Sequence, residues 1–301
     1  MARAFLCLAA LATLAPAASA RGPEIRLDDV DLFYRVYSAA GGHPSAEQLD
    51  RDYLGKGSAG LHEFARLRNV TGARMADALA KHPEYYTGAR KCLETLPAVK
   101  RRLTIAFTRL ARLYPEAAFP PVTILVGRGR PVGITNPSGV SVGLEALCMA
   151  DFMNPDPEDR FVHVIAHEYG HTQQSAAGQK DLEPGDPGAT VLALSLIEGA
   201  GELTAKLISG DVANDGPPEE ARGHEVEIGR RFLADQDKTD LSAWLYNAKP
   251  GAPGDLGYYV GFRIVKAYYD RAADKHLALA DIYAMRDPKQ LLAKSGWKPG
   301  D

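Results

Sequence analysis

Residues 161 to 174 read Phe161-Val-His-Val-Ile-Ala-His-Glu-Tyr-Gly-His-Thr-Gln-Gln174 and contain the pattern His-Glu-x-x-His. Positions four apart lie one above the other on one face of an α-helix, so His167 and His171 can bind one metal ion. Glu168 lies beside them, where its carboxylate can take a proton from metal-bound water. The pattern therefore predicts a Zn²⁺ site in which Glu168 is the general base.

A catalytic zinc ion takes three protein ligands and leaves a fourth position for water, so a third ligand is needed. Glu198 lies in the next predicted helix, within Ser195-Leu-Ile-Glu-Gly-Ala-Gly-Glu202. By analogy with sites made of two histidines and one glutamate, Glu198 is the expected third ligand. Glu202 follows one turn later on the same face. We expect it to accept the second ring N–H of His167; otherwise it is a surface charge.

The sequence around the motif predicts an α+β fold that is mostly helical. Residues 21–115 are typical of helices. Residues 122–126 and 140–144 are rich in β-branched side chains and separated by turn residues, which predicts a small antiparallel sheet. Asp156-Pro157 then favours a helix start before the motif. Further helices are expected at residues 190–209, 217–235, 257–273 and 287–294.

The N-terminus has the three-part layout of a signal peptide. Arg3 supplies the positive charge, Ala4 to Leu14 form a short apolar run, and Ala18-Ser-Ala20 has the small-x-small form of a cleavage site. We expect residues 1–20 to be removed, which predicts a periplasmic or secreted protein. The run is too short for a membrane span, and we expect no stable span in the mature chain. The formal net charge of −3 excludes the basic surface that nucleic-acid binding requires.

Removal of the signal peptide leaves two cysteines, Cys92 and Cys148. An oxidising compartment permits a disulfide between them, but the sequence does not fix their distance, so a bridge and two free thiols both stay open. We expect an N-terminal helical region over residues 21–118 and a catalytic region over residues 119–301. A single integrated domain over residues 21–301 is the alternative.

Two histidines and three glutamates in this order give the chain a family resemblance. His-Glu-x-x-His followed by Glu-Gly-x-x-Glu resembles the gluzincins, metallopeptidases whose zinc site has two histidines and one glutamate. More narrowly, the chain resembles a bacterial family of unknown function whose members are predicted zinc-dependent proteases. The segments that carry this resemblance are Tyr53–Leu61, His167–His171 with Gln174, Glu198–Glu202, Gly257–Gly261 and Leu291–Trp297.

The resemblance implies a zincin-like fold that hydrolyses peptide or protein substrates. It also implies a Tyr or His donor that stabilises the oxyanion of the tetrahedral intermediate, for which Tyr258, Tyr259 and His224 are the candidates. Zincins bind extended peptides along an edge strand, and residues 140–144 are the candidate for it unless they form an ordinary buried strand.

Glycines occupy two positions of the helix that carries Glu198. Gly199 and Gly201 lower the stability of an isolated helix, so we expect them to allow close packing on the motif helix. Gly201 is also a mild departure from the family pattern, in which we expect Ala.

The residues leave two other functions open. A non-catalytic or structural zinc-binding protein of the cell envelope would keep the metal ligands without turnover. Glu168 argues against it, because a structural zinc site needs no free base and usually closes with a fourth protein ligand. A zinc hydrolase acting on an ester or another amide would use the same residues. The sequence thus predicts a zinc metallopeptidase, without indicating its cleavage preference or oligomeric state.

Overall fold

The structure is a computed structural model that describes residues 23–129, 133–136, 138–150, 154–180, 182–214, 221–247 and 254–301. The expected signal peptide, residues 1–20, lies outside the described residues, and so does the expected helical start at residues 217–220.

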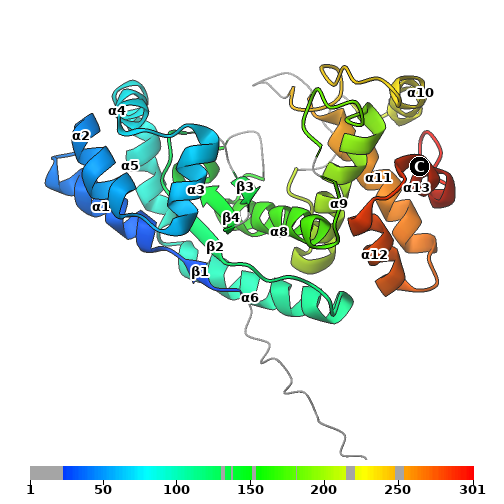
Figure 1. The fold of residues 1–301 in the computed structure, drawn as a ribbon, viewed down its shortest axis with the longest axis horizontal. Helices are drawn as coiled ribbons and strands as arrows, with labels where there is room; N and C mark the ends of the chain where they lie inside the picture. The colour runs from blue at the N-terminus through cyan, green and yellow to red at the C-terminus, as the bar shows by residue number, and fades with distance from the viewer. Residues whose placement is uncertain are drawn as a thin grey trace, which may run out of the picture.

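Helices dominate the structure, and one small sheet accompanies them (Figure 1). The N-terminal half contains α1 (Asp28–Ala39), α2 (Ala46–Gln48), η1 (Leu49–Tyr53), η2 (Leu54–Lys56), α3 (Ala59–Arg68), α4 (Gly72–Lys81), α5 (Pro83–Cys92) and α6 (Leu96–Leu113). Later in the chain follow α7 (Leu144–Cys148), α8 (Pro157–Ala176), α9 (Val191–Ser209), α10 (Glu225–Asp235), α11 (Leu256–Arg271), α12 (Lys275–Ala284) and α13 (Pro288–Ser295). The mostly helical α+β class is therefore confirmed.

The sheet is mixed, so the expectation of an antiparallel sheet was wrong. Its strands are β1 (Ile25–Arg26), β2 (Val122–Leu125), β3 (Gly133–Asn136) and β4 (Gly139–Gly143), in the spatial order β1-β2-β4-β3. β2 pairs in parallel with β1 and β4, and only β3 and β4 are antiparallel. The reason is that the chain reverses direction twice after β2. β3 runs opposite to β2, and the turn after β3 makes β4 run in the same direction as β2 again.

The strand at residues 140–144 is not an edge strand, which corrects a second expectation. β4 pairs on both sides, with β2 and β3, and the two outer strands are β1 and β3. Gly139 makes the turn into β4 with a φ of +118°, and a Cβ there would lie 2.1 Å from the carbonyl oxygen of Pro121. Only glycine can combine that φ with so close an approach to the neighbouring strand.

The helix α8 lies between the sheet and the C-terminal helices (Figure 1). Asp156 caps it by accepting a hydrogen bond from the backbone N–H of Glu158, and Pro157 occupies its first turn, which confirms the expected helix start. On its other side α8 contacts α9, and α9 contacts α11.

Glycines bring these three helices close together. A Cβ at Gly170 of α8 would lie 2.7 Å from the Cα of Gly201 on α9. A Cβ at Gly199 would lie 2.2 Å from the backbone carbon of Gly261 on α11. Gly201 therefore allows close packing on the motif helix, as expected, whereas Gly199 does so on α11, because it lies on the opposite face of α9.

The remaining helices differ from the expectation in several places. Within residues 221–247, α10 begins at Glu225, because Gly223 just before it has a φ of +85° that interrupts a helix. α7 was not expected. α12 was not expected, although Asp274 caps its start by accepting from the backbone N–H of Leu277. Among the described residues, no helix combines the length and the apolar character needed to cross a bilayer.

Cys92 and Cys148 form a disulfide that joins the ends of α5 and α7, with their Cα atoms 6.0 Å apart. Of the two alternatives that the sequence left open, the structure has the bridge. β1, from the N-terminal region, also pairs with β2. The division of the chain into domains stays a prediction.

Candidate metal centre

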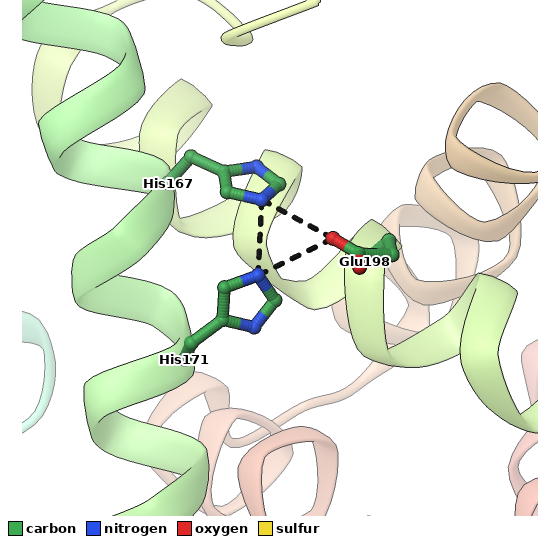
Figure 2. A group of neighbouring side chains, drawn as sticks. All are labelled: His167, His171 and Glu198. Atoms are coloured by element: carbon green, nitrogen blue, oxygen red, sulfur yellow. Dashed lines mark hydrogen bonds and ion pairs between the residues drawn. The ribbon is translucent and has the colours of Figure 1, made fainter. Parts of the chain in front are cut away.

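Three ligand atoms converge between α8 and α9 (Figure 2). The two Nε2 atoms of His167 and His171 lie 3.0 Å apart. The Oε2 atom of Glu198 lies 3.3 Å from each of them. His167 and Glu198 are buried, whereas the side chain of His171 is 21% exposed. Among the described residues, these three form a group that could share one metal ion.

The donor set and its spacing fit zinc. A tetrahedral zinc ion with bonds of about 2.0–2.1 Å holds its ligand atoms about 3.3–3.4 Å apart. The three measured separations, 3.0, 3.3 and 3.3 Å, lie close to that value. Two imidazole nitrogens and one carboxylate oxygen are also donors that zinc prefers in proteins.

The charges of the group depend on one another. Burial favours the neutral ring of His167, but the carboxylates of Glu202 and Glu198 outweigh it and raise its pKa well above 6.5. Burial also disfavours charge on His171, whose pKa is nevertheless raised by Glu198. Burial alone would raise the pKa of Glu198, yet the two histidines hold it well below 4.5. Protons therefore neutralise the buried carboxylate in the metal-free protein, and a metal ion would replace them.

Each histidine has a second polar partner at Nδ1. The Nδ1 atom of His171 lies 2.7 Å from Oε1 of Gln174, whose Nε2 donates to the carbonyl oxygen of Ile197 on α9. The Nδ1 atom of His167 lies 3.2 Å from Oε1 of Glu202, although the contact lacks the alignment of a hydrogen bond. Partners at Nδ1 leave Nε2 of both rings free for a metal ion.

Glu202 is itself fixed by the chain that follows α9. Its Oε2 accepts a hydrogen bond of 2.7 Å from the backbone N–H of Ala213, and its Oε1 accepts one of 3.0 Å from the side chain of Asn214. Glu202 is thus buried behind His167 and is not a surface charge, whereas the expected hydrogen bond from the ring N–H to its carboxylate is not formed.

Gly201 leaves room for the ring of His167. A Cβ at position 201 would lie 2.7 Å from Cε1 of that ring and 2.9 Å from both of its nitrogens. The departure from the expected Ala is therefore located at the site, where a methyl group would contact a ligand.

Glu168 faces the sheet side of α8. The hydroxyl of Thr135, on β3, lies 2.8 Å from Oε2 of Glu168 and 2.8 Å from its carbonyl oxygen. The side chain is half-buried. Its described contacts therefore tie α8 to β3, one of the two outer strands of the sheet.

Of the three expected oxyanion donors, the structure brings one near the histidines. The ring of Tyr258 lies nearly parallel to that of His167, with the ring centroids 6.1 Å apart. Tyr259 instead contacts Arg263, whose guanidinium lies 6.0 Å from the centre of its ring. His224 has a side chain that is 64% exposed and pairs with Glu227. Tyr259 and His224 therefore have partners outside the group, because Tyr259 lies against Arg263 and His224, which precedes α10, is exposed and pairs with Glu227.

Tyr246 belongs to the site, although the sequence did not suggest it. Its hydroxyl donates a hydrogen bond of 2.8 Å to Oε1 of Glu198. Burial of the hydroxyl and the charge of Glu198 raise the pKa of this phenol above its usual 10. Tyr246 lies in an irregular loop between α10 and α11 and is part of no motif, so no pattern could have identified it.

The comparisons with known proteins give one result. The family model of the gliding motility protein GldB matches residues 225–299, which run from α10 to beyond α13 and follow both helices of the metal centre. No curated protein and no solved structure matches the chain at a significant level.

This match overturns the expected family and activity. The matched family is named for a role in gliding motility and not for proteolysis. The resemblance to zinc-dependent proteases was therefore wrong, and so was the prediction of a peptidase or other hydrolytic enzyme. The physical reason is that His-Glu-x-x-His fixes where two ligands lie on a helix and does not fix what reaction follows. Residues 225–299 are thus similar to a motility protein, and the chain places beside them a group of side chains suited to a metal ion.

Proposed function

We propose that the protein is a non-catalytic protein of the cell envelope. It binds a divalent metal ion through His167, His171 and Glu198, and Zn²⁺ is the ion that these donors fit best. The observation that carries the metal site is the convergence of their three donor atoms at 3.0 to 3.3 Å. Gln174 and Glu202 support it, because Gln174 is hydrogen-bonded to Nδ1 of His171 and the carboxylate of Glu202 lies 3.2 Å from Nδ1 of His167.

Three observations support a place in the envelope. The N-terminus has the layout of an export signal. Cys92 and Cys148 form a disulfide, which is rare in a reducing cytosol. Residues 225–299 resemble the gliding motility protein GldB, which favours a role in cell motility with another protein as the partner.

The metal ion would act as a cross-link between helices. Two of its ligands belong to α8 and the third to α9, and a structural metal site contributes its binding free energy to the fold. α9 in turn contacts α11, which lies within the segment that resembles GldB. The ion would therefore fix the position of the helix on which that segment packs.

We also propose that α8, α9 and the sheet have a zincin-like arrangement, because α8 lies against β3 and β4 and α9 lies beside it. We further propose that an N-terminal helical region over residues 21–118 is followed by a second region over residues 119–301.

The test is zinc content. The exported protein is purified without added chelator, and its zinc is measured by mass spectrometry and by competition with a fluorescent chelator. We expect about one zinc ion per chain, lost in His171→Ala and retained in the control His224→Ala, because His224 is exposed and outside the group. Absence of zinc uptake by the wild type, or equal zinc uptake by the two variants, would refute the proposed metal site.

A further inference from the structure

Tyr246 combines two features that rarely occur together. Its backbone φ is +58°, a left-handed conformation that is uncommon for an aromatic residue. The residue is 53% exposed, yet its hydroxyl is buried against a buried carboxylate, that of Glu198. Strained residues that the surrounding structure holds in place are concentrated at functional sites.

The chain on both sides of Tyr246 is tied to the start of α11. The carbonyl oxygen of Trp244 accepts a hydrogen bond of 2.7 Å from the backbone N–H of Gly257. Asn247 and Asp255 exchange two hydrogen bonds, each from a backbone N–H to the side chain of the other, at 3.0 and 2.7 Å. These contacts hold the left-handed residue between two fixed points.

The two oxygen atoms of the Glu198 carboxylate have different partners. Oε1 accepts from Tyr246 at 2.8 Å, whereas Oε2 lies 3.3 Å from both His167 and His171. The ring of Tyr246 packs edge-on against that of Tyr258, with the ring centroids 6.3 Å apart. The side chain is thus held by its ring while its hydroxyl faces the carboxylate.

We propose that Tyr246 is a positioning residue of the metal centre, which holds Oε1 of Glu198 so that Oε2 alone serves as the ligand. This inference rests on the proposed metal site. Because Tyr246 is exposed and Glu198 is buried, Tyr246 also lies on the solvent side of the ligand. Tyr246 belongs to the segment that resembles GldB, so that segment contributes directly to a site whose ligands lie outside it.

The experiment compares Tyr246→Phe with the control Tyr259→Phe. Each removes one hydroxyl from a tyrosine, but Tyr259 lies against Arg263, away from the ligands. Zinc affinity is measured by competition with a chelator, and Co²⁺ is used in place of zinc to record visible absorption. Far-UV circular dichroism is expected to show the same helix content in both variants, because Phe occupies the same space.

We expect Tyr246→Phe to bind zinc about 10- to 100-fold more weakly, the usual effect of losing a partner of a metal ligand. We also expect its Co²⁺ spectrum to lose intensity, because a carboxylate with both oxygens free can add a second bond to the ion. Tyr259→Phe is expected to match the wild type in both measurements.

The outcomes separate this inference from the proposed function. A wild type that binds neither zinc nor Co²⁺ would refute the metal site itself. A wild type that binds both ions, with Tyr246→Phe equal to it in affinity and in spectrum, would refute only the role of Tyr246.

Discussion

Replacing Gly201 with Ala tests the geometry of the metal centre most directly. The added Cβ would lie 2.7 Å from Cε1 of His167, whereas carbon atoms in favourable contact lie about 3.5–4.0 Å apart. The overlap is therefore about 1 Å. The ring cannot easily move away, because His167 is buried between α8 and α9 and contacts Glu202.

The magnitude follows from two opposing effects. Overpacking in a well-packed core costs about 1–3 kcal/mol. Replacement of glycine by alanine in a helix returns about 1 kcal/mol. The free energy of unfolding should therefore fall by only about 0–2 kcal/mol. If the zinc-bound position of the ring bears the full strain, zinc affinity should fall roughly 5- to 140-fold, since about 1.4 kcal/mol is tenfold.

The assay is a zinc competition titration of Gly201→Ala together with its thermal unfolding, with and without zinc. Gly199→Ala is the matched control, because its Cβ would collide with the backbone of α11 and not with a histidine. We expect Gly199→Ala to lose more stability than zinc affinity, and Gly201→Ala to show the reverse. If Gly201→Ala binds zinc as tightly as the wild type, then His167 does not lie where the structure has it in the bound state.

The other predictions concern the partners, the charges and the disulfide. Glu202→Gln should weaken zinc binding about 10- to 100-fold, since it removes the carboxylate beside Nδ1 of His167; an unchanged dissociation constant in a chelator competition would contradict this. Because the pKa of His167 is raised above 6.5, its charged form stabilises the metal-free protein below about pH 6.5. This contribution is lost as the pH rises through the raised pKa, whereas zinc affinity, which needs the neutral ring, rises over the same interval. Urea unfolding and zinc titrations across that range should therefore show opposite trends, and parallel trends would be evidence against the assignment. Reduction of the Cys92–Cys148 bridge should lower the free energy of unfolding by about 2–4 kcal/mol without changing zinc affinity, as denaturation and titration with and without reductant can show.

The parts of the site that depend on local geometry could be predicted from the sequence. His167 and His171 share a helix face because of their spacing, and Glu198 and Glu202 do so for the same reason. Tyr246 could not be found in this way. Its contact with the distant Glu198 depends on an irregular loop that hydrogen bonds tie to the start of α11, and such a loop leaves no periodic signal.

The same limit applies to the sheet and to the activity. Residues 122–126 and 140–144 were recognised as strands, but their parallel pairing depends on the path of the chain between them. The expected activity rests on the ligand pattern and on the family resemblance built around it, and ligand geometry is common to proteins of different function. The similarity of residues 225–299 to the GldB family model corrected the expected activity, and these residues lie outside the His-Glu-x-x-His motif.

The position of α9 has a mechanical consequence. On one face its backbone contacts α8 at Gly201, and on the opposite face it contacts α11 at Gly199. Side chains in a core can change rotamer to absorb a small displacement, but backbone atoms in contact cannot. A shift of α9 would therefore not be absorbed on either face, and α11 would have to move with it. In this part of the molecule the three helices should behave as one stiff unit, whose spacing is set by the absence of side chains.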